Sequence, residues 1–157
     1  MTDKSLIDTN ILVYSYEKPP SEGHKCRVCL DLILNCFKGE KAGVISNQIL
    51  AEFFYVITRK SATPLPPPEA QRLVFLLEAS NHWQKLNYTT KTVINASELS
   101  RRYQLSFWDA LIAATMLENN IFTIYTENEK DFLKIPGIKV INPATIFPPL
   151  PSTLPAF

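Results

Sequence analysis

The sequence predicts an α/β fold in which helices cover both faces of a mostly parallel sheet of four or five strands. Two observations support this prediction. Short apolar segments of strand length alternate along the chain with longer segments whose apolar residues recur at helical spacing. The strand segments are apolar throughout, as strands buried on both faces of a parallel sheet are. With 157 residues, of which 46% are hydrophobic, and no visible internal repeat, the chain suits one domain with one core.

The first apolar run, residues 6–14, is interrupted by Asp8, Thr9 and Asn10. A short buried strand is therefore expected to end near Ile7, and the loop after it is expected to carry the three polar residues. Asp8 would then lie at the carboxyl end of a strand.

Helical spacing of apolar residues begins near residue 21 and ends at Gly39, and residues 43–46 read as a second buried strand. A polar residue at the end of that strand can cap the next helix, which is expected to reach about Lys60. Glu52 falls in the early turns of this helix.

The second half of the chain alternates in the same way. Helices are predicted over residues 69–80, with Pro67 or Pro68 at the start, and over 90–103 and 107–118, the last of them capped by Ser106. Residues 83–88 are expected to be extended, and 121–125 and 139–141 to be strands, with a carboxyl-end loop over 126–132. Residues 61–68 form a proline-rich connector. We expect the folded domain to span 1–147 and the proline-rich residues 148–157 to form an extended tail.

The formal charge of +1 indicates no strongly basic domain, so any contact with nucleic acid must come from local basic groups. No run of about 18 apolar residues is present, and Asp3 and Lys4 stand where a signal peptide would be apolar. We therefore expect a cytoplasmic protein with no membrane segment.

Three cysteines lie close together, and the spacing of Cys26 and Cys29, with His24 and Cys36 nearby, suggests a zinc site. The cysteines, however, share the apolar face of a predicted helix, where free cysteine acts as a small hydrophobic residue. An odd number of cysteines also does not suit a disulfide framework. Buried free thiols are the favoured interpretation.

Acidic residues gather at one edge of the predicted sheet. The carboxyl ends of parallel strands meet at that edge, which brings Asp8, the helix carrying Glu52 and the loop over 126–131 together, and Asp109 is able to point there. Three or four carboxylates without histidine or cysteine select hard cations such as magnesium or manganese. Simpler alternatives remain open: Asp8 as a turn residue, and Asp109 as the third-position acid of a capping box begun by Ser106.

The segments that carry these acids resemble the four successive motifs of the PIN domain family. They are LIDTNIL at 6–12, QILAEF at 48–53, FWDALIAA at 107–114 and YTENEKDF at 125–132, and VINP at 140–143 matches a common ending of the family. The resemblance covers about residues 5–143, and the motifs lie in the family's order and spacing. It implies an α/β/α sandwich and an RNA-cleaving hydrolase that uses one or two magnesium or manganese ions.

By this resemblance Asp8, Glu52 and Asp109 are catalytic ion ligands, and VapC-type toxins are the most similar members in pattern. Thr9 and Asn10 would fix Asp8 or contact phosphate, and Thr126 would orient the ligands. Many members have an aspartate where this chain has Asn128. We expect Asp131 to be the fourth ligand in place of that aspartate, in preference to Glu127 and Glu129. Asn128 can ligate through its carbonyl oxygen, but the lost charge would weaken a second ion site.

Possible RNA contacts are Arg59 and Lys60, on the Glu52 helix, and Arg101 and Arg102. Trp108 could stack on a base, although the apolar start of its helix favours a core or partner-facing position. The resemblance also implies a homodimer and, for a toxin, an antitoxin partner.

Two alternatives of other classes remain. One is a non-catalytic PIN-like module that binds RNA or protein. The other is a phosphatase with Asp8 as nucleophile. Such a site would be expected to have a second aspartate two residues after Asp8, and the residue at that position is Asn10.

Overall fold

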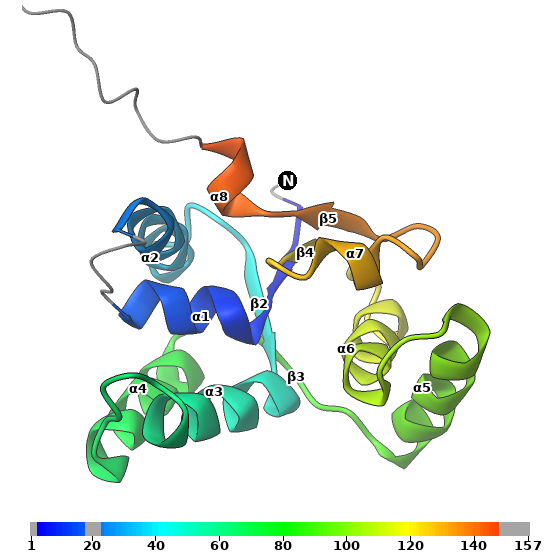
Figure 1. The fold of residues 1–157 in the computed structure, drawn as a ribbon, viewed down its shortest axis with the longest axis horizontal. Coiled ribbons are helices and arrows are strands. Elements are labelled where there is room, and N and C mark those ends of the chain that lie inside the picture. Colours follow the sequence, from blue (N-terminus) through cyan, green and yellow to red (C-terminus); the bar gives the residue numbers. More distant parts are fainter. Residues whose placement is uncertain (1–2, 18–22, 148–157) are drawn as a thin grey trace, which may run out of the picture.

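The computed structural model describes residues 3–17 and 23–147. Its centre is a five-stranded sheet, parallel throughout, with strand order β3-β2-β1-β4-β5 (Figure 1). The strands are β1 (Ser5–Ile7), β2 (Gly43–Ser46), β3 (Gln84–Leu86), β4 (Thr123–Tyr125) and β5 (Lys139–Ile141). The predicted α/β class and parallel sheet are confirmed.

Helices cover both faces of this sheet. They are α1 (Thr9–Tyr16), α2 (Gly23–Phe37), α3 (Asn47–Arg59), α4 (Pro67–Ala79), α5 (Thr90–Tyr103), α6 (Phe107–Glu118), α7 (Glu129–Phe132) and α8 (Pro143–Ile146). In Figure 1 helices α1 to α4 lie on one side of the strands and α5 and α6 on the other, which gives three layers. The chain leaves β1 toward β2, and it leaves β4 toward β5 in the opposite direction along the sheet. The central pair β1 and β4 therefore forms a topological switch point.

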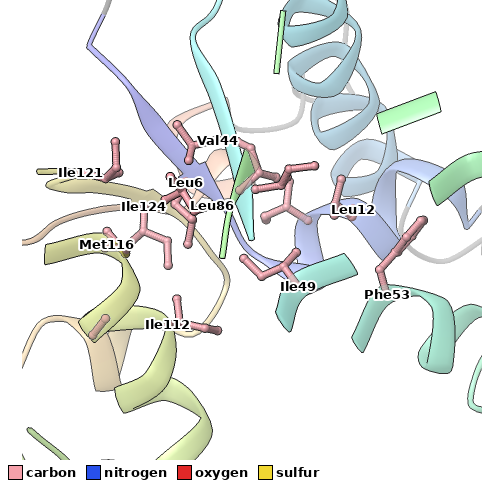
Figure 2. Packing of buried hydrophobic residues seen from close by; sticks show 14 of the residues in the cluster. Leu6, Leu12, Val44, Ile49, Phe53, Leu86, Ile112, Met116, Ile121 and Ile124 are labelled. Carbon is pink, nitrogen blue, oxygen red and sulfur yellow. The ribbon is translucent and has the colours of Figure 1, made fainter. Parts of the chain in front are cut away.

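The core lies on both faces of the central strands. Leu6 of β1, Val44 of β2 and Ile124 of β4 are fully buried. Figure 2 shows Leu12, Ile49 and Phe53 on one side of these strands, and Ile112 and Met116 on the other. Helix α6, expected to be apolar nearly all round, has its whole stretch from Ala110 to Met116 buried. This packing fixes the position of α6 and hence of the residues at its amino end.

Asp8, Thr9 and Asn10 were expected to lie in a loop after the first strand, and this expectation is wrong. Helix α1 begins directly at Thr9, because the Asp8 side chain accepts a hydrogen bond from the Thr9 backbone N–H and caps the helix. The polar residues thus start a helix that continues into the apolar residues after them. Similarly, only residues 126–128 of the expected loop over 126–132 lie outside regular structure before α7 begins.

Most other element boundaries agree with the sequence. Helices α5 and α6 have the expected bounds, Ser106 caps α6, and Pro67 is the first residue of α4. Helix α8 was not predicted; Asn142 caps it through the Ala144 N–H. The expected helix start at residue 21 and the proline-rich tail over 148–157 lie outside the described residues.

Cys26, Cys29 and Cys36 are buried along α2, and none of the three forms a disulfide. Burial raises the pKa values of Cys29 and Cys36 to about 12, so both thiols stay protonated at neutral pH. None of the helices within 3–17 and 23–147 combines the length and apolar character needed to cross a membrane.

Candidate active site at the carboxyl edge of the sheet

A cleft of about 370 Å³ opens where β1 and β4 end. Asp8 directly follows β1, and Thr126 directly follows β4. Crevices of this kind, beyond the carboxyl ends of strands at a switch point, are where open parallel sheets bind ligands. The cleft is lined by Asp8, Thr9, Asn10, Val13, Tyr14, Glu17, Glu52, Val56, Trp108, Asp109, Ile112 and Asn128.

Asp8 is a buried carboxylate, only 6% exposed. Its Oδ1 accepts from the Thr9 N–H at 2.7 Å, and its Oδ2 accepts from Thr126 Oγ1 at 2.7 Å and from Asn10 Nδ2 at 3.3 Å. All three donors are neutral. Burial raises the pKa of Asp8 to about 6 in spite of these bonds, and the nearby charges of Glu52 and Asp109 add to the rise. Among the described residues that line the cleft, no lysine or arginine offsets the charge of this carboxylate.

Glu52 lies in the second turn of α3 and is half-buried. Its Oε2 accepts from Thr9 Oγ1 at 3.0 Å, and its Oε1 accepts from Gln48 Nε2 at 2.9 Å. Thr9 also supplies the N–H bound to Asp8, so one residue orients both carboxylates. This arrangement accounts for a charged side chain on a helix whose neighbouring positions are apolar.

Gln48 was not singled out from the sequence, although it lies one turn before Glu52. It is buried, and its Nε2 donates both to Glu52 and, at 3.0 Å, to the backbone oxygen of Trp108. Its Oε1 is buried without a hydrogen-bond partner in the described part of the chain. Gln48 thus joins the Glu52 carboxylate to the amino end of α6. In the sequence, the only signal for this role is an amide side chain one helical turn before an acid.

Asp109 lies in the first turn of α6 and is half-buried. The Ser106 hydroxyl accepts from the Asp109 N–H at 3.1 Å and donates to Asp109 Oδ2 at 2.8 Å. Ser106 therefore caps the helix, while the Asp109 side chain accepts from the Ser106 hydroxyl and also lines the cleft. Burial raises the pKa of Asp109, and the nearby charge of Asp131 contributes.

Asn128 lines the cleft at the fourth motif position. Its N–H donates to Thr126 Oγ1 at 3.0 Å, and its Nδ2 lies 3.4 Å from Asp109 Oδ2. Asn10 also binds residues of the loop over 126–128. Its Oδ1 accepts from the Glu127 N–H at 3.2 Å, and its Nδ2 donates to both Asp8 and Thr126. The fourth position thus brings an amide, not a carboxylate, to the cleft.

The three acids considered as fourth ligands are not among the residues that line the cleft. Asp131 pairs with Lys134 at 3.1 Å, and this hydrogen bond lowers the pKa of Asp131. Glu127 pairs with Lys25 of α2 at 2.5 Å. Glu129 accepts from Asn142 at 3.2 Å. Each of these acids already has a donor elsewhere, and the choice of Asp131 stays a prediction.

The residues of the cleft fit a hard divalent cation in their donor chemistry. Asp8, Glu52 and Asp109 offer carboxylate oxygens, and no lysine or arginine is among the described residues that line the cleft. Oxygen ligands of this kind suit magnesium or manganese. Within residues 3–17 and 23–147 no three acidic, histidine or cysteine side chains are already clustered as a metal site. An ion would therefore have to draw the carboxylates closer together.

The expected basic contacts lie away from the cleft. Arg59 and Lys60 are exposed at the end of α3, where Lys60 Nζ lies 5.4 Å from the Tyr55 ring centroid. Arg101 and Arg102 are exposed in the last turn of α5. A role in RNA binding stays a prediction for both pairs.

The family model of the PIN domain matches residues 5–138. Among solved structures, the fold is similar to a toxin-antitoxin complex from Klebsiella pneumoniae, with a TM-score of 0.63 and 23% identity over 89% of this chain and 98% of that chain. It is also similar to VapC20 from Mycobacterium tuberculosis, a sarcin-ricin loop cleaving toxin, with a TM-score of 0.63 and 17% identity over 81% and 92% of the two chains. DNA-bound VapBC from Salmonella typhimurium gives a TM-score of 0.59 and 23% identity over 89% and 98%. No curated protein matches the chain.

Proposed function

The chain belongs to the PIN domain family, and from that premise we propose that it is a divalent-metal-dependent endoribonuclease. The observation that carries the proposal is the convergence of Asp8, Glu52 and Asp109 on one cleft whose described lining contains no lysine or arginine. Carboxylates that face each other without a cation raise one another's pKa, so their convergence favours a bound metal ion. Magnesium or manganese, one or two ions per chain, matches the donors.

A divalent ion held by these carboxylates would activate water for attack on a phosphodiester and stabilise the leaving oxygen. The chain's own residues supply rigidity. Three neutral donors fix both oxygens of Asp8, while Thr9 and Gln48 fix the two oxygens of Glu52. These hydrogen bonds would keep the carboxylate oxygens oriented while a bound ion draws the three side chains closer together. Thr126 ties the Asp8 carboxylate to the loop that presents Asn128.

The test is digestion of a panel of labelled RNAs by the wild type and by Asp8→Asn, with manganese, magnesium or a chelator. Asp8→Asn removes a ligand charge at nearly constant volume, and its side-chain oxygen can still cap α1. Cleavage that needs metal, leaves 5′-phosphate ends and is lost in Asp8→Asn would support the proposal. Asp31→Asn, an exposed acid on α2, is the matched control and should cleave like the wild type.

One observation favours a second candidate, a non-catalytic PIN-like module that binds RNA or protein. Asn128 stands on the cleft where a fourth carboxylate would strengthen a second ion site. Metal binding by the wild type without cleavage of any RNA would select this candidate.

We also propose that the protein is a toxin with an antitoxin partner. The similar structure from Klebsiella pneumoniae is described as a toxin-antitoxin complex, and VapC20 from Mycobacterium tuberculosis is described as a toxin. An apolar groove of about 200 Å³ between α1, α2, α3 and α4, lined by Leu12, Leu30, Leu34, Phe37, Phe53, Leu73, Leu76 and other residues, is suited to an apolar protein segment. Growth arrest on expression of the wild type, and none with Asp8→Asn, would support the toxin role. Light scattering would test the expected homodimer.

A further inference from the structure

Trp108 is 62% exposed and lies on the wall of the cleft beside Asp109. Of the two positions expected for this side chain, core or partner-facing, the core position is therefore wrong, and the partner-facing position stays a prediction. Single exposed aromatic residues are common on protein surfaces and carry little information by themselves. The position of this one, next to a proposed ion ligand, is what gives it meaning.

The backbone and the ring of Trp108 each have one contact. The backbone oxygen accepts a hydrogen bond from Gln48, which also donates to Glu52. The ring packs edge-on against Phe107, with centroids 5.5 Å apart and an interplanar angle of 72°. An exposed ring fixed in this way loses little conformational freedom when something binds to its face.

The charges of the cleft limit what can bind there. Its carboxylates repel phosphate, and among its described lining residues none is a lysine or arginine. A polynucleotide near the reaction site must therefore gain binding energy from bound metal and from contacts other than ion pairs. Aromatic rings provide such contacts, and the cleft has two: Trp108 from α6 and Tyr14 from α1.

We propose that Trp108 is a stacking platform for an unpaired nucleobase beside the phosphodiester that is cut. This inference rests on the proposed nuclease function and assigns to Trp108 the binding of the base next to the phosphodiester that is cut. In a duplex both faces of a base are covered by its neighbours, so the indole can stack only on a base in a single strand, in a loop or turned out of a helix.

The experiment uses the full chain and fluorescence, since the protein has two tryptophans. Trp83 is 2% exposed, so quenching by added RNA reports on Trp108, and the Trp108→Phe variant gives the background from Trp83. The probes are a single-stranded RNA dodecamer, the same strand with abasic sites at successive positions, and its blunt duplex. Each is titrated into the wild type with chelator and into Asp8→Asn with manganese, so that binding is read without cleavage.

We expect the single strand to quench Trp108, the duplex to quench it far less, and one abasic position to reduce the quenching. Anisotropy of a labelled strand should show that Trp108→Ala weakens binding roughly 5- to 100-fold, the loss typical of one stacked base, and that Trp108→Phe retains most of it. Phe75→Ala, which removes another exposed aromatic side chain outside the cleft lining, should leave binding unchanged.

Equal binding by Trp108→Ala and wild type, or equal quenching by duplex and single strand, would overturn the inference. Dissociation of a dimer by Trp108→Ala, without loss of RNA binding, would assign the indole to a protein contact and also overturn it. Failure of the nuclease proposal itself would appear separately, as stacking on RNA that the wild type never cleaves.

Discussion

At the scale of single residues, Asp8 combines two opposed roles. Its hydrogen bonds to Thr9, Asn10 and Thr126 stabilise the charged form, and the first of them starts α1. Burial disfavours the charged form by more than these hydrogen bonds favour it, so the pKa of Asp8 is raised to about 6. The same carboxyl group therefore helps the fold as a helix cap and destabilises it as an uncompensated charge.

This conflict predicts a pH dependence for the metal-free protein. The pKa of Asp8 is higher in the folded state than in the unfolded chain, so the folded state holds the proton more tightly. Its contribution is fully present below about pH 4 and is lost as pH rises to about 6, by about 3 kcal/mol. Urea unfolding in chelator at pH 4.5 and 7.5 should show the free energy of Asp8→Asn rising relative to wild type over this range. Parallel pH profiles for the two proteins would contradict the prediction.

Gln48 is the residue that should affect the site without touching a substrate. Gln48→Leu removes the bonds to Glu52 and to the Trp108 backbone, together with the unpartnered Oε1. Partners that orient ligands typically contribute 10- to 100-fold to metal affinity or activity, so manganese affinity should fall by about that factor.

Calorimetric titration with manganese checks this expectation. Gln84→Leu is the matched control, because Gln84 of β3 also has a buried Oε1 without a partner and is not a lining residue of the cleft. Equal manganese affinity in wild type and Gln48→Leu would show that Glu52 needs no such support.

At the scale of elements, the strands and long helices could be predicted because their apolar residues recur with a regular period. Helix α6 is the clearest case, since Ser106 marks its start and its apolar residues continue to Met116. Helix α1 was missed because the Asp8–Asn10 sequence also suits a loop. Asp8 caps the helix through the Thr9 N–H, and its other carboxylate oxygen is held by Thr126, which directly follows β4. Local patterns cannot show such contacts between distant segments.

The residues of the candidate site could likewise be predicted only in part. Asp8, Glu52 and Asp109 were proposed together because the strand before Asp8 ends at this edge of the sheet and the other two acids lie early in their helices. The structure brings all three to one cleft. Gln48 was missed, and Asp131 does not line the cleft, because which side chain of a loop or helix faces inward depends on packing. Asn128 faces the cleft through its bonds to Thr126 and Asp109.

Packing between elements also predicts where the chain tolerates no added atom. A Cβ on Gly43, at the start of β2, would lie 2.9 Å from Cys36 Sγ and 2.9 Å from two Trp83 ring carbons. Gly43→Ala should therefore lower the free energy of unfolding by about 1–3 kcal/mol through overpacking. Urea unfolding measures this, with Gly23→Ala, where a Cβ meets nothing within 4 Å, as the control. A Gly43→Ala protein as stable as the wild type would mean that α2 shifts freely against the sheet.

At the scale of the whole molecule, the topology creates the site. The connections after β1 and β4 diverge, so their carboxyl ends are left uncovered, and α3 and α6 add Glu52 and Asp109 from opposite faces of the sheet. The carboxylates thus come from separate layers of the fold. A cation that binds them all would cross-link these layers in the folded state only.

Binding of a divalent ion should therefore stabilise the folded protein as a whole. An ion that binds only the folded state adds about 2.7 kcal/mol at 100 times its Kd, which for a domain of this size raises Tm by roughly 5–10 °C. Thermal unfolding at pH 7.5 with manganese, compared with chelator at equal ionic strength, measures this gain. Asp8→Asn should lose most of the gain, because the variant keeps the layers but removes the central charge between them. An equal rise of Tm in both proteins would mean that the ion binds elsewhere on the chain. No rise of Tm in either protein would mean that the three carboxylates do not bind the ion.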